Sequence, residues 1–259
     1  ATRFIHIQTT VKGGNIVGMG TSDWALSIAT GAFTTQTSSL SRGDFGDAST
    51  GRLDFNVAAA GRFVGKALTR QLDAAPTQST LYMSGMLSAS SLETVSTGIG
   101  GVMGFTDGDA ASFSSPGFFG GLMFGFRGDG SNSNLVLWGG GNARIIAENV
   151  SADTSYHVVA EVIFNTDGNE MINVWLNPDG ATSQGSPDYT TVADYADALS
   201  DFSHASIYTR VKSATGTSFD ELTLGTSFTD VVIPEPSSYA LFFGVVSFGS
   251  LVLCRRRRY

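Results

Sequence analysis

The sequence of 259 residues contains one cysteine, Cys254, close to its C-terminus. A single cysteine excludes both an intrachain disulfide and a cysteine-based metal site. The three histidines, His6, His157 and His204, are far apart, so they show no zinc-binding spacing and no Gly-x-Ser-x-Gly context of a catalytic triad. Without disulfides, the fold must be stabilised by the burial of its apolar side chains.

Glutamate is also scarce, with six residues in the chain. Retaining glycosidases need two carboxyl groups about 5–5.5 Å apart, and no predicted strand carries a Glu-x-Asp-x-x-Glu pattern that would supply them. Asp220 and Glu221 are adjacent, and adjacent residues of a strand point to opposite faces. The sequence therefore predicts no catalytic residues and no enzymatic activity. The alternative is a glycan hydrolase of concanavalin-like fold whose carboxylates converge from distant strands.

Basic residues are few outside the last positions of the chain. Before Pro234 the sequence has 11 Lys and Arg against 22 Asp and Glu. An acidic surface repels nucleic acid and anionic lipid, so neither is expected as the main partner of this part. It favours solubility and permits cation-bridged association with an acidic polymer.

Glycine accounts for 32 residues while lysine and glutamate are sparse, a composition that disfavours long helices. The clearest strands are residues 155–164 and 171–177, which are rich in β-branched and aromatic residues and flank an Asp-Gly turn. We predict an antiparallel hairpin with Val158, Val162 and Phe164 on one face. Further strands are predicted at residues 79–87, 121–128, 134–139, 143–150, 205–211 and 218–225, and a short helix at residues 192–200.

Candidate binding residues are few. Exposed tryptophan rings stack on sugars, so Trp24, Trp138 and Trp175 are candidate sugar-stacking residues, with burial in the core as the alternative for each. Acidic turns at residues 107–109, 129–132 and 167–170 carry oxygen ligands of the kind that Ca²⁺ takes, but none has the spacing of a recognised calcium loop. We predict no metal ligands and no cofactor, with Ca²⁺ as the alternative. Arg-Gly-Asp at residues 42–44 and 127–129 is explained by chance in a chain so rich in glycine and aspartate.

The C-terminal segment places an apolar run between prolines and arginines. Residues 239–254 carry no charge, and as a helix they span about 24 Å, slightly less than the roughly 30 Å core of a bilayer. Because Pro234 and Pro236 keep the backbone extended, the helix is predicted at residues 237–254. The positive charge that follows would hold its end on the cytoplasmic side. This basic cluster consists of Arg255, Arg256, Arg257 and Arg258.

The order of Pro234, Glu235 and Pro236, then an apolar helix containing glycine, then an arginine cluster resembles a PEP-CTERM sorting signal over residues 232–259. The resemblance implies a protein exported by a Gram-negative bacterium, with an inner-membrane intermediate. It implies cleavage near the Pro-Glu-Pro by a membrane protease of the exosortase type. The final location would be the cell surface or the extracellular exopolysaccharide matrix.

A second resemblance is best matched over residues 52–231. The order of LYMSGML (81–87), the segment 156–178 and the segment 218–231 is similar to the laminin-G and concanavalin-A-like jelly rolls. It implies an antiparallel β-sandwich for residues 1–231, with the strand at residues 219–225 near the other terminus of the domain. We interpret the chain as an exported, carbohydrate-binding or structural β-sandwich. Ala1 begins the sequence without a signal peptide, so an exported chain of this kind is expected to be processed or a fragment.

The tail gives a prediction that mass spectrometry of the surface-exposed protein can check. Changing Pro234, Glu235 and Pro236 to alanine should leave membrane insertion intact but block processing, because the extended cleavage site is lost. Changing the four arginines to serine should instead weaken the orientation of the helix. A mature form that still carries Arg258 and Tyr259 would show a permanent anchor in place of a sorting signal.

Overall fold

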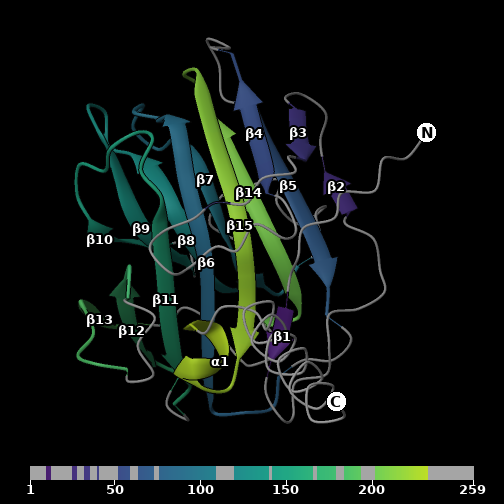
Figure 1. Cartoon of the computed structure of the whole chain (residues 1–259), viewed down its shortest axis with the longest axis vertical. Helices are drawn as coiled ribbons and strands as arrows, with labels where there is room; N and C mark the ends of the chain where they lie inside the picture. Colours follow the sequence, from purple (N-terminus) through teal and green to yellow (C-terminus); the bar gives the residue numbers. More distant parts are fainter. Residues whose placement is uncertain are drawn as a thin grey trace, which may run out of the picture.

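Two β-sheets packed face to face form the protein (Figure 1). The structure, a computed structural model, describes residues 10–12, 25–27, 32–35, 40, 52–58, 64–72, 76–108, 120–139, 142–165, 168–178, 184–193 and 202–232. In this part of the chain the larger sheet has eight strands and the smaller sheet has seven. All pairings are antiparallel except that of β1 with β15.

The larger sheet has the order β13-β12-β11-β6-β15-β4-β3, with β1 beside β15. Its strands are β1 (Thr10–Lys12), β3 (Ala32–Thr35), β4 (Leu53–Val57), β6 (Thr80–Ser91), β11 (Tyr156–Ile163), β12 (Glu170–Leu176), β13 (Tyr189–Ala193) and β15 (Thr215–Gly225). The smaller sheet has the order β10-β9-β8-β7-β14-β5-β2. Its strands are β2 (Ala25–Ser27), β5 (Val64–Gln71), β7 (Ile99–Thr106), β8 (Gly121–Gly128), β9 (Ser133–Gly139), β10 (Asn142–Ala147) and β14 (His204–Val211).

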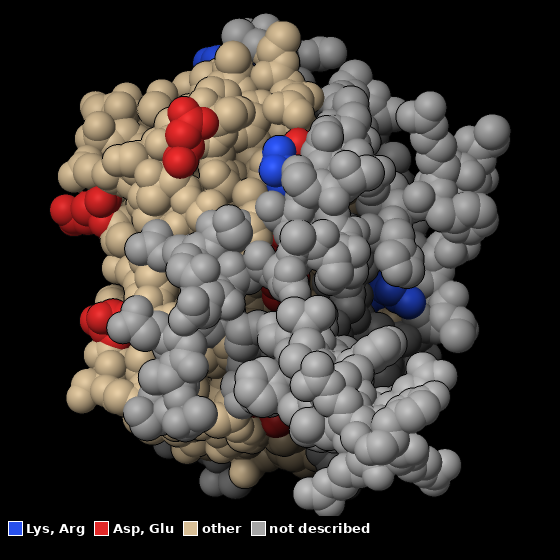
Figure 2. Space-filling model, viewed as in Figure 1, with Lys and Arg blue, Asp and Glu red and all other residues tan. Residues whose placement is uncertain are grey.

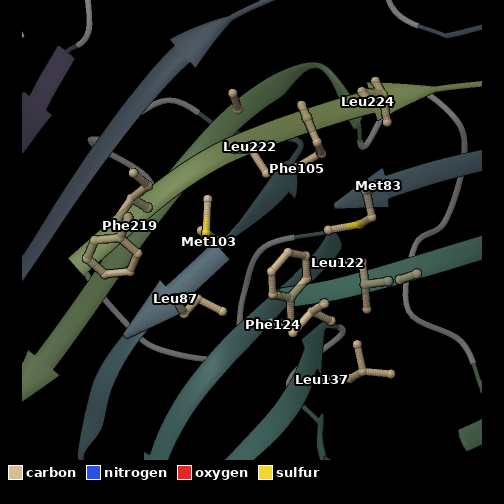
Figure 3. Close-up of a cluster of buried hydrophobic side chains, with 14 of the residues drawn as sticks. Met83, Leu87, Met103, Phe105, Leu122, Phe124, Leu137, Phe219, Leu222 and Leu224 are labelled. Atoms are coloured by element: carbon tan, nitrogen blue, oxygen red, sulfur yellow. The ribbon is translucent and has the colours of Figure 1, made fainter. Parts of the chain in front are cut away.

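The core lies between the sheets and consists of alternate side chains from each strand. Figure 3 shows Met83 and Leu87 of the larger sheet close to Met103 and Phe124 of the smaller one. All four are essentially inaccessible to solvent. Burial of each such side chain contributes about 1.5–3 kcal/mol to folding, which is how the domain is stable without a disulfide.

Each sheet also buries apolar side chains on its outer face. On the larger sheet, the short helix α1 (Phe228–Val232) lies over the outer face (Figure 1). Its Phe228 and Val232 belong to one buried cluster with Tyr82 and Trp175. The Asp230 carboxylate accepts hydrogen bonds from the Thr226 and Ser227 backbone N–H groups, which fixes the start of this helix. The outer cluster of the smaller sheet consists of Ala67, Ile99, Val102, Met123, Trp138 and Tyr208.

Glycine is abundant partly because β7 and β8 approach each other closely. A Cβ atom at Gly104 would lie 2.2 Å from the Leu122 carbonyl oxygen, and one at Gly125 would lie 2.0 Å from the Gly101 oxygen. Any side chain at these two positions would collide with backbone, so the spacing of this strand pair requires glycine.

The structure confirms the predicted hairpin. Strand β11 pairs with β12 in the register Val158↔Leu176 and Val162↔Ile172, and Val158, Val162 and Phe164 share the core face. Strands β6, β8, β9, β10, β14 and β15 also lie where the sequence predicted strands. The predicted helix at residues 192–200 is wrong at its start, because Val192 lies in β13 and pairs with Met171 of β12. The remainder of that segment lies outside the described residues.

The all-β, antiparallel sandwich predicted from the sequence is confirmed. Strand β15 pairs with β1 near the N-terminus and with β4, as the resemblance implied for residues 219–225. The predicted C-terminal helix at residues 237–254 lies outside the described residues. Within the described ranges, no helix is both long enough and apolar enough to span a membrane.

Candidate functional site

A pocket of about 210 Å³ opens on the outer face of the smaller sheet, at the end of β8, β9 and β10. We call it the Arg127 pocket. Drug-sized ligands occupy sites of about 300–1,000 Å³, so this pocket has the size for a single small group such as one sugar ring. It is lined by Ser96, Thr97, Arg127, Gly128, Asp129, Asn134, Val136, Ala143 and Ile145.

The alternation of the strands supplies the floor of the pocket. On β8, Leu122, Phe124 and Phe126 point into the core, so Arg127 points outward beside the next strands. On the neighbouring strands Val136 pairs with Ile145, giving two apolar side chains on the same face. Ile145 is 45% exposed, which is unusual for a large apolar residue in the described part of the chain. The floor is therefore apolar and accessible.

One wall of the pocket is the loop between β6 and β7, which carries backbone strain. Thr97 has a φ of 66°, and a β-branched residue in the left-handed region is a genuine outlier that costs about 1–3 kcal/mol. Its carbonyl oxygen accepts a hydrogen bond of 3.3 Å from the Arg210 guanidinium. The loop is also joined to the β8–β9 turn, since Gly130 N donates to the Thr94 oxygen at 2.8 Å.

A buried carboxylate, Glu93, holds this loop in place. Its oxygens accept hydrogen bonds from Val95 N at 2.8 Å, from Lys212 N at 2.5 Å and from both the N–H and the hydroxyl of Ser213. Burial raises the pKa of the Glu93 carboxyl, but these hydrogen bonds outweigh burial and hold the pKa below its ordinary value. Glu93 therefore ties the pocket wall to the turn between β14 and β15.

The acidic residue of the rim is occupied within its own turn. Asp129 accepts hydrogen bonds of 2.8 Å from the Ser131 and Asn132 backbone N–H groups and one of 3.3 Å from the Asn134 amide. The backbone hydrogen bonds from Asn132 and Ser131 lower the pKa of Asp129. The carboxylate is thus ionised and shapes the turn.

The cation of the pocket has no such partner. Arg127 is half-buried, and within the described ranges its guanidinium forms neither an ion pair nor a hydrogen bond. Across the sheet, Ile99 of β7 pairs with Arg127 on one side and with Arg210 on the other. Adjacent strands lie about 4.8 Å apart, so the Cα atoms of the two arginines are roughly 10 Å apart. Both residues lie on the outer face of an otherwise acidic chain.

A second polar cluster, which we call the Tyr82 network, lies on the outer face of the larger sheet. The Tyr82 hydroxyl donates a hydrogen bond to Glu161, and the Asn173 amide donates to the other oxygen of that carboxylate at 2.7 Å. Gln184 donates to the Tyr82 hydroxyl at 3.2 Å, and Thr190 donates to the Asn173 carbonyl at 2.8 Å. Burial raises the pKa of Tyr82 to about 12, with the hydrogen bond and the charge of Glu161 acting in the same direction.

Figure 2 looks onto the face of the larger sheet, and acidic side chains are scattered along the left side of its described part. Glu161 itself is only 8% exposed. The Tyr82 network is therefore a satisfied, mostly buried acid–phenol pair.

The tryptophans proposed for sugar stacking are buried where they are described. Trp138 is 6% exposed and packs against Tyr208 with ring centroids 5.8 Å apart, and Trp175 is 4% exposed and packs against Phe228 at 5.2 Å. Both therefore lie in clusters and do not present an open ring. Trp24 lies outside the described residues, as do the sorting motif of Pro234, Glu235 and Pro236 and the four-arginine cluster.

Among the residues that the structure describes, no group of three or more His, Cys, Asp or Glu side chains is arranged to hold a metal ion. The turn at residues 129–132 uses Asp129 for hydrogen bonds to its own backbone.

The side chains of Asp220 and Glu221 do not follow the regular alternation between the two faces of the sheet. The register with β6 shifts between Asp220 and Thr223, and Glu221 has a φ of 54°. Glu221 thus sits in a β-bulge.

Sequence reasoning missed the Arg127 pocket, although it singled out Arg-Gly-Asp at residues 127–129. A lone outward arginine on a strand is an ordinary sequence feature. Its environment depends on the loop carrying Thr97 and on the edge strand carrying Ile145, which only the sheet register brings together. The turn signal at residues 129–132, directly after Arg127, was the one sequence feature that could have indicated the pocket.

The chain matches no protein-family model and no curated protein. Among solved structures, it is similar to an endo-β-1,4-glucuronan lyase from the fungus Trichoderma reesei, with 13% identity, 78% of this chain and 90% of that chain covered, and a TM-score of 0.45. An alginate lyase from Aplysia kurodai has 12% identity, covers 75% and 87%, and has a TM-score of 0.48. The metal-free carbohydrate recognition domain of Emp46p has 11% identity, covers 79% and 88%, and has a TM-score of 0.46.

These comparisons correct one prediction. The expectation of no enzymatic activity is contradicted, because several similar structures are polysaccharide lyases. That expectation was drawn from the lack of a hydrolase-type pair of carboxylates. A lyase cleaves its glycan by elimination, which does not need this pair of carboxylates. The lack of the pair therefore does not exclude a lyase.

The Glu93 contacts give a prediction about stability. Replacing Glu93 by glutamine puts an NH₂ group where an acceptor oxygen stood, so at least one buried N–H donor loses its partner. We expect the free energy of unfolding at pH 7 to fall by about 1–3 kcal/mol, measured by urea denaturation. The matched variant Glu148→Gln, at an exposed position, should change it by less than about 0.5 kcal/mol.

The same substitution has a defined pH dependence. Because the folded pKa of Glu93 lies below its unfolded value of about 4.3, its stabilisation is present above that value and is lost as pH falls through the folded pKa. The difference between the wild-type chain and the Glu93→Gln variant should shrink as the pH is lowered below about 4. A constant difference across this range would contradict the assignment.

Proposed function

We propose that the chain is a glycan-binding β-sandwich protein and that the Arg127 pocket is its saccharide site. The observation that carries the proposal is an accessible apolar floor beside a half-buried guanidinium that has no partner among the described residues. Sugar rings have one face of C–H groups and a rim of hydroxyls, so they suit an apolar floor bordered by polar groups. The pocket volume matches one ring.

The walls support this assignment because they are held before any ligand arrives. Glu93 and Arg210 fix the β6–β7 loop from two sides, and Asp129 fixes the opposing turn. A preorganised site loses less entropy on binding than one that must be ordered first. The strain at Thr97 is the kind of feature that persists where surrounding contacts over-determine the backbone.

We also propose, from the sequence alone, that the C-terminal segment sorts the protein to the cell surface or the exopolysaccharide matrix. In this proposal residues 237–254 hold the chain in the inner membrane, with Arg255, Arg256, Arg257 and Arg258 inside the cell. An exosortase-type protease then cuts near Pro234, Glu235 and Pro236. An exported glycan-binding domain would meet its ligand in that matrix.

Filling the pocket tests the proposal without removing a polar group. The Ala143→Phe variant places a ring on the pocket floor, and we expect at least a tenfold loss of affinity in a glycan-binding screen with the full chain in mild detergent. The matched variant Ala152→Phe adds the same ring at an exposed position outside the pocket and should bind as the wild type does. Equal binding by both variants would place the saccharide site elsewhere.

A second candidate function is glycan cleavage at the Tyr82 network. A phenol hydrogen-bonded to a carboxylate can pass a proton to a leaving oxygen, which is general acid catalysis. The pKa of about 12 keeps Tyr82 protonated at neutral pH. In this proposal the Glu161 carboxylate beside it takes a proton from the sugar carbon, the C–O bond breaks as the C=C bond of the product forms, and Tyr82 gives its proton to the leaving oxygen. This observation favours an activity that does not depend on two facing carboxylates.

Cleavage of soluble glycans, followed by size and by the ultraviolet absorbance of an unsaturated product, tests this second function. The Tyr82→Phe variant keeps the ring against Phe228, whose centroid is 6.4 Å away, but lacks the proton, so any activity should fall about 100-fold or more. Tyr156→Phe, which removes a hydroxyl from another part of the fold, should retain it. If both variants keep full activity, Tyr82 is not the acid.

A further inference from the structure

We infer that the Arg127 pocket selects acidic saccharides, with the Arg127 guanidinium binding the carboxylate of a uronate residue. This inference rests on the proposed function, since it assumes that the pocket takes a sugar. It adds the class of sugar and the residue that recognises it.

The first step is the charge balance of the pocket. Asp129 lines the pocket and Glu93 anchors the loop that forms its wall, and each carboxylate is engaged by backbone N–H donors. Neither forms an ion pair with Arg127. The hydrogen-bond donors of the Arg127 guanidinium are therefore not taken up by either carboxylate.

The second step is the cost of that arrangement. A half-buried guanidinium with unmade hydrogen bonds is less well solvated than one in water. A carboxylate in the pocket would accept two parallel hydrogen bonds from the planar fork of Arg127, which is the strongest pairing that this side chain forms. A neutral sugar would leave the Arg127 charge unpaired. The pocket therefore favours an acidic sugar over a neutral one.

The third step is the neighbouring cation. Arg210 lies in the same row of the sheet, on the other side of Ile99. It donates to the Thr97 oxygen and so holds the pocket wall, while its charge adds to the positive potential on this face. The chain as a whole has a formal net charge of −8, so on this face the two arginines provide the attraction for an anion, against the Asp129 carboxylate of the rim.

The apolar floor of the pocket favours a uronate over a free inorganic anion. Val136 and Ile145 pair across β9 and β10 and offer apolar surface next to the charge. A small anion has no apolar face to place there, whereas a uronate ring carries its carboxylate beside a face of C–H groups. The pocket thus matches the combined shape and charge of the acidic sugar.

The experiment compares each acidic oligosaccharide with its own neutral form. Oligogalacturonides and oligoglucuronides, and the same oligosaccharides after reduction of their carboxyl groups to alcohols, are titrated into the full chain in mild detergent. We expect the acidic forms to bind at least tenfold more tightly. Raising the salt concentration should narrow the difference.

Variants then test the residue. Arg127→Gln should abolish the preference for the acidic form, and Arg127→Lys, which keeps the charge but not the fork, should retain part of it. Arg52→Gln removes the same charge from the larger sheet, where Arg52 pairs with Asp54, and should leave the preference intact. Thermal unfolding should be unchanged in Arg127→Gln, because Arg127 has no hydrogen bond to lose within the described ranges.

The outcomes distinguish this inference from the function on which it rests. Equal binding of acidic and neutral forms, lost in Ala143→Phe, would overturn the acidic selectivity and leave the saccharide site standing. An acidic preference that survives Arg127→Gln would overturn the role of Arg127. Binding of neither form to the wild-type chain would overturn both proposals.

Discussion

The structure depends on one constraint, which is that successive residues of a strand point to opposite faces of its sheet. Without a disulfide in the domain, the inner face must be mostly apolar, and the residues that meet between the sheets, such as Met83, Phe124 and Phe219, are completely buried. The outward positions are then the ones left for polar chemistry. Arg127 follows Phe126 on β8 and Glu161 follows Ala160 on β11, so both candidate sites are the reverse side of core-forming strands.

The polar side chains on the outer faces of the two sheets are paired differently. On the larger sheet, Glu161 shares its oxygens between Tyr82 and Asn173, and α1 closes over the neighbouring aromatic rings. On the smaller sheet, the carboxylates Glu93 and Asp129 accept hydrogen bonds from loop backbone, and the Arg127 guanidinium has no partner among the described residues. A satisfied network mainly holds structure or relays a proton, whereas a guanidinium without a protein partner beside a cavity has its hydrogen-bond donors available to a ligand.

Much of the fold could be predicted because local signals agreed with the final pairing. The β11–β12 hairpin has β-branched strands and a turn signal, and both were sufficient. Strand β7 was missed because its sequence, IGGVMGFT, is rich in glycine, which is typical of a loop. In the structure, the close approach of β7 to β8 is what requires glycine there. The predicted helix at residues 192–200 failed at Val192 because pairing with β12 overrides weak local helix preference.

The candidate site could not be predicted in the same way, because no short segment contains it. Thr97, Arg127 and Ile145 come from three separate parts of the chain, and their meeting follows from the order β10-β9-β8-β7 and from the loop that Glu93 anchors. The strain at Thr97 is stable only while that anchor and the Arg210 contact hold. The same buried hydrogen bonds that stabilise this end of the sandwich therefore set the shape of the pocket, so binding and stability at this site are physically coupled.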